Sequence, residues 1–94
     1  MTFPLQNIHA HQVDFMEKFE KQGGISFILL HFTTPNEIYY LPFRDIKKFW
    51  NRGQEGGRKS FTYEEVDHSF LVSSRHGTMI HYLEMLQKDL ESRD

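Results

Sequence analysis

The residues with the most obvious chemistry lie near the beginning of the chain, in the segment NIHAHQ, residues 7–12. The imidazoles of His9 and His11 are potential metal ligands or proton carriers, and the amide of Gln12 is a potential ligand for a hard cation. Two residues apart on a helix, side chains point about 200° away from each other, so they cannot share one ion. We therefore expect no metal site built on the two histidines.

Other catalytic patterns are incomplete. The chain has no cysteine, and its serines lack a nucleophile-elbow sequence. The segment GGRKS, residues 56–60, lacks the spaced glycines and the strand–loop–helix context of a phosphate-binding loop. An acidic residue two places before a lysine suits a metal-dependent nuclease, and only Asp45 and Lys47 show that spacing. Because both fall within a helical periodicity, we interpret them as a solvated helix face.

Charge is distributed unevenly along the chain. Residues 44–59 contain six basic and two acidic residues, whereas the rest contains five basic and eleven acidic residues. A basic segment with glycines suits a phosphate backbone, because Lys and Arg supply charge and Gly permits a close approach. A solvated surface loop is the alternative. The basic residues of this segment are Arg44, Lys47, Lys48, Arg52, Arg58 and Lys59.

The composition predicts one small domain, residues 1–94, because 38% hydrophobic and 15% aromatic residues suffice for a single core. The absence of cysteine is compatible with a reducing compartment, so we expect a cytoplasmic protein. The longest apolar run, residues 25–32, is too short to span a bilayer and follows no charged leader. We expect no membrane association.

The elements that must position these residues begin with a helix. Residues 7–22 show amphipathic periodicity, with Asn7 as the expected N-cap and Gly23 as a left-handed C-terminal stop. The continuous apolar run at residues 25–32 predicts a strand that is buried on both faces. Such a strand suits the middle of a sheet.

The centre of the chain predicts a hairpin followed by a helix. Residues 33–37 carry turn chemistry, and residues 38–41 form the second strand. Helical spacing predicts a short helix over residues 44–51 with Trp50 packed inward, and residues 52–60 are expected to be a loop.

The remaining segment is expected to hold one helical turn capped by Thr62 and Glu65, a short strand at residues 70–72 and a C-terminal helix. We therefore predict an α/β fold, a small mixed sheet flanked by helices. The sheet looks incomplete, as if strands preceded Met1. The apolar side of the C-terminal helix is expected to comprise Met79, Ile80, Leu83, Leu86 and Leu90.

Four segments taken together resemble the RecU family of bacterial Holliday junction resolvases. They are TFPLQNIHAHQ (residues 2–12), GGISFILLHF (23–32), FW (49–50) and GGRKS (56–60). The likeness runs from Thr2 to about Leu83. It implies part of a restriction-endonuclease-like fold and a homodimeric, Mg²⁺-dependent endonuclease that cuts four-way DNA junctions in recombination and repair.

The resemblance assigns only one metal ligand to this chain. Gln12 matches the glutamine that follows the family's catalytic strands, whereas the acidic residues, the acidic-x-Lys pair and the junction-inserted stalk are expected upstream of Met1. A single amide oxygen cannot hold Mg²⁺, which takes about six oxygen ligands. We therefore assign no catalytic residue here and expect this chain, the C-terminal portion of a resolvase, to be inactive alone. Residues 78–82, TMIHY, depart from the family pattern.

The same resemblance places Arg58 and Lys59, together with Lys48 and Arg52, near branched DNA, where they would contact phosphates without reading sequence. The alternative is a non-catalytic DNA-binding or protein-interaction module that retains the resolvase scaffold. A third interpretation is an unrelated small α/β domain.

Overall fold

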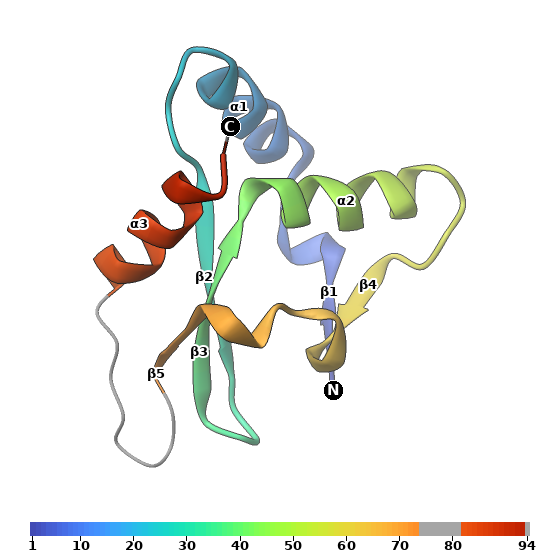
Figure 1. Cartoon of the computed structure of the whole chain (residues 1–94). Coiled ribbons are helices and arrows are strands. Elements are labelled where there is room, and N and C mark those ends of the chain that lie inside the picture. Colours follow the sequence, from blue (N-terminus) through green and yellow to red (C-terminus); the bar gives the residue numbers. More distant parts are fainter. Residues whose placement is uncertain (74–81, 94) are drawn as a thin grey trace.

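The structure, a computed structural model, describes residues 1–73 and 82–93 (Figure 1). This part of the chain forms three helices and five short strands, so the predicted α/β fold class is confirmed. In order, the elements are β1 (Thr2–Pro4), a 3-10 turn (Leu5–Asn7), α1 (Ala10–Lys21), β2 (Phe27–Phe32), β3 (Glu37–Pro42), α2 (Phe43–Gln54), β4 (Ser60–Thr62), two further 3-10 turns (Tyr63–Glu65 and His68–Phe70), β5 (Leu71–Ser73) and α3 (Tyr82–Glu91).

The strands form two small sheets instead of one. A two-stranded sheet pairs β1 with β4, and a three-stranded sheet has the order β2-β3-β5. Every pairing among the described strands is antiparallel, which differs from the mixed sheet that we expected. The predicted hairpin between β2 and β3 is confirmed, with residues 33–36 as its turn and Asn36 at a φ of 52°. That left-handed conformation is one that asparagine tolerates well.

The prediction that β2 is buried on both faces is wrong. Leu30 and Phe32 are buried, but Leu29 is 48% exposed and His31 is exposed. Successive side chains of a strand point to opposite faces, and β2 is the outer strand of its sheet. Burial therefore alternates along a strand whose hydrophobicity does not.

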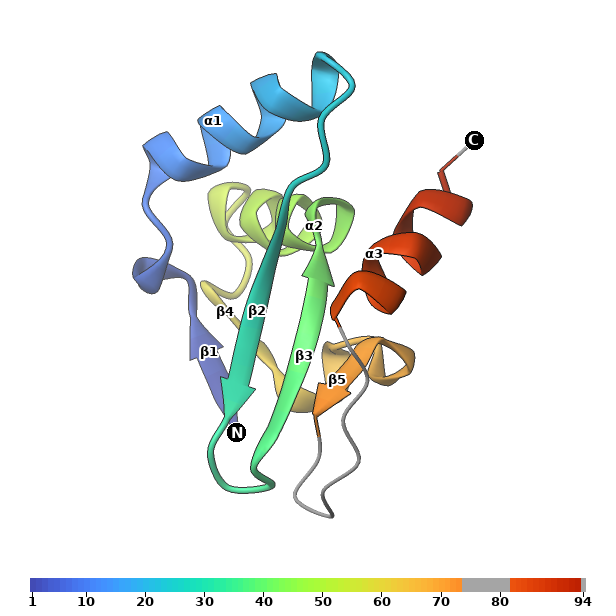
Figure 2. The ribbon, with the colours of Figure 1, turned by 90° about the vertical axis from the view of Figure 1, so that its left-hand side faces the viewer.

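The central strand β3 separates two cores. Tyr39 and Leu41 point into the larger core, which α1, α2 and the small sheet complete, whereas Tyr40 points into a second core beneath α3. Figure 1 shows α3 on one side of β2 and β3 and α2 on the other, and Figure 2 shows β2, β3 and β5 next to one another. The strand thus links the N-terminal helices to the C-terminal helix.

The boundaries of the helices correct several predictions. The first helix begins at Ala10, not Asn7, although Gly23 ends it at a φ of 89° as expected. The second is longer than predicted and runs from Phe43 to Gln54, with Trp50 half-buried against the core. The loop is accordingly shorter, and β4 begins at Ser60.

The predicted apolar side of α3 is wrong at Leu83 and Leu90 and confirmed at Leu86. Leu83 is 51% exposed and Leu90 is 44% exposed, whereas Met85 and Asp89 are the buried residues. Leu86 is half-buried as part of the second core. The helix is rotated relative to its hydrophobic pattern because the buried face contains an aspartate with polar partners. Met79 and Ile80 lie outside the described residues.

Candidate functional site

The N-terminus of α1 positions Gln12. Its Oε1 accepts a hydrogen bond from the backbone N–H of His9 at 2.9 Å. His9 is the N-cap, with an extended backbone at φ −87° and ψ 148°, so the expectation of Asn7 in that role is wrong. The reciprocal contact from the third helical residue stabilises a helix start at Ala10, whereas Asn7 ends a 3-10 turn. The Gln12 side chain is thereby held at the surface by the helix that it caps.

The two histidines are closer than helical geometry predicts. Because His9 lies outside the helix, the rings of His9 and His11 stack with centroids 5.6 Å apart and planes 7° from parallel. The separation that we expected is therefore wrong. Within residues 1–73 and 82–93, no group of three or more His, Asp or Glu side chains is arranged to hold a metal ion.

A groove of about 770 Å³ opens beside Gln12 between α1, β1 and β2. Its walls are mostly apolar, and Phe15, on α1, is 68% exposed at its side. Asp14, the one carboxylate among the lining residues, pairs with Lys18 at 3.0 Å. The lining residues are Phe3, Asn7, Ile8, His11, Gln12, Asp14, Phe15, Met16, Lys18 and Ile28.

These residues do not fit a magnesium ion on their own. Mg²⁺ takes near-octahedral oxygen coordination that usually includes one or two carboxylates. Gln12 offers one amide oxygen, which has a second lone pair beyond the His9 contact. The groove therefore presents an outer ligand without the carboxylates of a metal centre.

The basic loop after α2 is organised by one carboxylate, Glu65. Arg52 donates to both of its oxygens, at 2.7 and 3.2 Å, and Arg58 donates to Oε1 at 2.9 Å. The backbone N–H of Thr62 donates to Oε2 at 2.8 Å, which confirms the predicted capping box. The Arg52 and Thr62 hydrogen bonds lower the pKa of Glu65 to about 2. We call Glu65, Arg52 and Arg58 the Glu65 cluster.

The basic segment is thus more neutral than its sequence indicates. Lys47 donates to Glu17 of α1 at 2.6 Å, and Arg44 pairs with Asp89 of α3 at 3.1 Å. Lys59 and Lys48 are exposed and form no ion pair with any residue in the described ranges. Lys48 lies over the ring of Phe49, 5.2 Å from its centroid.

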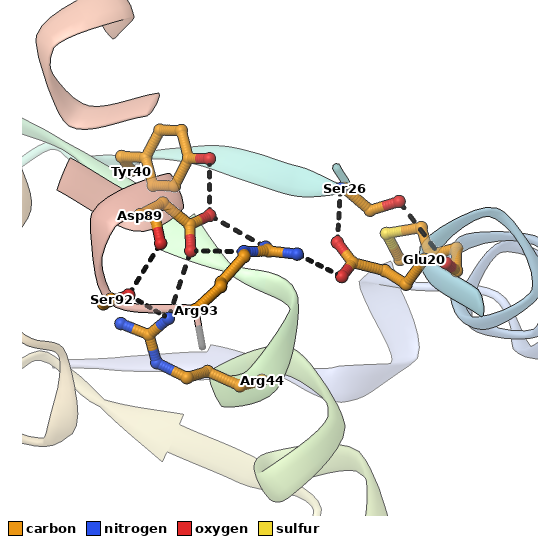
Figure 3. A network of polar contacts seen from close by, with 8 residues as sticks. Glu20, Ser26, Tyr40, Arg44, Asp89, Ser92 and Arg93 are labelled. Carbon is orange, nitrogen blue, oxygen red and sulfur yellow. Dashed lines mark hydrogen bonds and ion pairs between the residues drawn. The ribbon is translucent and has the colours of Figure 1, made fainter. Parts of the chain in front are cut away.

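A second polar cluster, which the sequence analysis missed, centres on Asp89 (Figure 3). Its carboxylate is fully buried and accepts hydrogen bonds from Tyr40 at 2.7 Å and from Arg93 at 2.9 and 3.0 Å. Burial raises the pKa of Asp89, but the hydrogen bonds from Arg93 and Tyr40 and the nearby cations outweigh burial, so the net shift is downward. The spacing of four between Asp89 and Arg93 is the one local signal of this site, because Tyr40 and Arg44 are more than forty residues away in the sequence.

The residues around Asp89 also contact α1. Arg93 pairs with Glu20, whose Oε2 accepts the backbone N–H of Ser26 at 2.6 Å. Figure 3 shows Arg93 between the two carboxylates, with Arg44 on the other side of Asp89. We call Asp89, Tyr40, Arg44, Arg93 and Glu20 the Asp89 network. Its role is structural, since it joins α3 to β3 and to the end of α1.

None of the helices within the described ranges is long and apolar enough to cross a membrane.

The sequence matches the family model described as "RecU: Recombination protein U" over residues 1–88. It is 42% identical to the Holliday junction resolvase RecU of Bacillus cytotoxicus over 86 residues, which are 90% of this chain and 43% of that protein. The proteins of the same name from Bacillus thuringiensis and Bacillus anthracis are 43% identical to this chain, again over 90% of this chain and 43% of each protein.

The chain therefore spans less than half the length of these curated relatives. The match nevertheless covers nearly all of this chain, including Gln12, the basic loop and the first residues of α3. The resemblance carried by the four sequence segments is confirmed, and the chain belongs to the RecU recombination protein family.

Proposed function

We propose that this chain is the C-terminal portion of a RecU-type Holliday junction resolvase, a cytoplasmic, homodimeric, Mg²⁺-dependent endonuclease that cuts four-way DNA junctions. The observation that carries the proposal is the family match over residues 1–88. The curated relatives bear the name Holliday junction resolvase, which supports branched DNA as the substrate.

In this proposal Gln12 completes a metal site whose carboxylates come from a part of the resolvase that this chain does not contain. Two features support it. β2 is the outer strand of its sheet, and the groove beside Gln12 is bordered by Ile28 of that strand. An added strand would pair with the free edge of β2, cover the apolar groove and bring carboxylates towards the Gln12 amide. Without them, the chain alone is inactive.

The basic loop is the proposed DNA contact. Lys59 and Arg58 are exposed and approach the backbone phosphates, with Lys48 beside them on α2. Arg52 is held by Glu65 and by the carbonyl of Ser60 at 2.8 Å, so it braces the loop and adds a weaker contact. Such contacts position DNA without selecting a sequence.

A chimera tests the proposal. The segment of the Bacillus cytotoxicus protein that aligns with this chain is replaced by this chain, and cleavage of a four-way junction is measured with and without Mg²⁺. We expect the chimera to cut, the chain alone not to cut, and Gln12→Ala in the chimera to reduce cleavage at least about tenfold, since outer ligands commonly contribute 10–100-fold.

The matched control is Gln22→Ala, which removes an exposed glutamine at the other end of α1. Metal-dependent cutting by the purified chain alone would contradict the missing-carboxylate argument. A folded chimera that binds junctions without cutting them would favour the second candidate, a non-catalytic DNA-binding or protein-interaction module. That candidate is supported by the lack of a three-residue metal group within the described residues.

A further inference from the structure

A second cavity, of about 450 Å³, lies against the same 3-10 turn and shares Ile8 with the groove beside Gln12. It is bounded by that turn, by the last turns of α2 and by the end of the basic loop. Its chemistry differs from that of the apolar groove, because it combines one indole, two primary amides and one ammonium group. The lining residues are Pro4, Leu5, Gln6, Ile8, Trp50, Gly53, Gln54 and Lys59.

The frame of this cavity is fixed by the backbone. The N–H of Leu5 donates to the carbonyl of Lys59 at 3.0 Å, and Pro4 is in register with Ser60 in the small sheet. A Cβ added at Gly53 would lie 3.1 Å from Cδ1 of Leu5, so α2 approaches the turn as closely as a glycine allows. The cavity is therefore preformed, which reduces the entropic cost of binding.

The polar side chains that line the second cavity can bind a ligand without first breaking a contact to another described residue. The side chains of Gln6, Gln54 and Lys59 are exposed and form no hydrogen bond or ion pair with any other residue in the parts of the chain that the structure describes. Trp50 is half-buried and presents part of its surface to the cavity. An amide carries both donors and an acceptor, an indole carries a flat apolar face, and the ammonium carries a positive charge.

We propose that this cavity binds the base of an unpaired nucleotide in a DNA strand, with Trp50 against the base, Gln6 and Gln54 on its hydrogen-bonding edge and Lys59 towards its phosphate. A nucleotide presents the three complementary features together: a flat π-face, an edge of adjacent donors and acceptors, and an anionic group. A duplex phosphate backbone would need only the ammonium group. The indole and both amides therefore point to an exposed base.

A DNA strand is favoured over a free nucleotide because the cavity continues into the basic loop. Lys59 belongs to both, and Arg58 precedes it on the exposed side. Further phosphates of the same strand would lie along these charges. The inference extends the proposed function, since strands of branched DNA pass from one duplex to another at the branch point, where a base can leave its pair, but it requires neither a metal nor cleavage.

Trp50 is the only tryptophan of the chain, so its fluorescence reports the cavity directly. The purified chain is titrated with a short thymidine oligonucleotide and with an abasic oligonucleotide of equal length and charge, at one salt concentration. We expect quenching by the thymidine strand and at least about tenfold weaker binding of the abasic strand, because the abasic strand has no base to stack on Trp50. Thymidine monophosphate should bind more weakly than the oligonucleotide.

The double variant Gln6→Ala, Gln54→Ala should weaken binding of the thymidine strand about tenfold while leaving the abasic strand unaffected. Both positions are exposed, so the fold should not change, and Gln22→Ala with Gln87→Ala is the matched control. Equal binding of both oligonucleotides, or saturation without quenching, would overturn the proposal, and equal affinity for thymidine monophosphate would overturn its assignment to a strand. Failure of the chimera to cut junctions would leave this binding result unchanged, so the two proposals fail separately.

Discussion

The Asp89 network and the Glu65 cluster use the same chemistry in different surroundings. Each has one carboxylate held by two arginines. The carboxylate of Asp89 is fully buried, whereas that of Glu65 is 25% exposed. The arginines differ less, because each cluster has one that is about 30% exposed, Arg93 or Arg52, and one that is about half exposed, Arg44 or Arg58. The clusters therefore differ in their anion, which is closed off from solvent at Asp89 and open to solvent at Glu65.

This difference separates a structural site from a candidate binding site. Removing one partner of a buried ion pair leaves a desolvated polar group without compensation, so the fold depends on the whole network. At the loop, solvent compensates for a lost partner, and an exposed guanidinium can exchange Glu65 for a phosphate. Burial of the carboxylate, not the number of charges, therefore decides whether its arginines can exchange it for a phosphate.

The largest expected effect comes from Asp89→Ala. This change leaves the buried hydroxyl of Tyr40 without its acceptor and Arg93 without its main partner. We expect the free energy of unfolding to fall by about 3 kcal/mol, measured by urea denaturation. Asp14→Ala is the control, because the Asp14–Lys18 pair is exposed and should change stability by less than about 0.5 kcal/mol. Similar effects of both changes would contradict the contrast between the clusters.

A smaller effect, which depends on pH, is expected for Glu65→Gln. The variant keeps an oxygen for the Thr62 N–H but removes the charge that Arg52 and Arg58 bind. The pKa of Glu65 is lowered from 4.5 to about 2, so its charge stabilises the fold fully above pH 4.5 and this contribution is lost as the pH falls to about 2. We expect a loss of about 1.5 kcal/mol at neutral pH.

The measurement is urea denaturation of the wild type and the variant at a series of pH values. The difference in unfolding free energy between them should shrink as the pH decreases from 4.5 towards 2. A difference that is constant over this range would mean that the carboxylate charge is not what stabilises the loop.

The smallest effect on stability, and the largest on DNA binding, is expected for Arg58→Ala combined with Lys59→Ala. Both side chains are exposed, so the free energy of unfolding should change by less than about 1 kcal/mol. The slope of log affinity against log salt concentration should become shallower by about 0.9 for each DNA phosphate that the variant no longer neutralises. Fluorescence anisotropy with a labelled four-way junction measures this slope.

The charge-matched control is Lys18→Ala with Lys21→Ala, two exposed lysines of α1, of which Lys18 borders the groove beside Gln12. It alters net charge equally without touching the basic loop. If both double variants change the slope equally, binding follows overall charge and the loop is not the contact surface.

Much of the fold is predictable because its signals are local. The hairpin follows from turn residues between two apolar runs, the capping box from Thr62 and Glu65, and the end of α1 from Gly23. The family resemblance is also readable from four segments, because their order and spacing survive in the linear sequence. Whether Gln12 touches a metal and whether the loop touches DNA remain predictions.

The errors arise where burial depends on neighbours distant in the chain. A continuous apolar run predicts a strand buried on both faces, but β2 has a partner on one side only, and Leu29 is exposed. The hydrophobic pattern of α3 predicts that Leu83 and Leu90 face inward. Asp89 is buried instead, because Tyr40 and Arg44 satisfy its carboxylate from elements that precede it by more than forty residues.

The sequence by itself determined the three helices, the hairpin of β2 and β3 and the capping box of Thr62 and Glu65, since these depend on contacts a few residues apart. It also determined the family. It did not reveal β1, β4 or His9 as the N-cap of α1. Only the tertiary structure decided which charges are neutralised, which face of α3 is buried and which side chains share a cavity. Glu65 holds Arg52, Asp89 holds Arg93 and Lys59 is left without an acidic partner among the described residues. The sequence gives the charge of each side chain, but the packing of distant elements decides whether that side chain is free to bind a ligand.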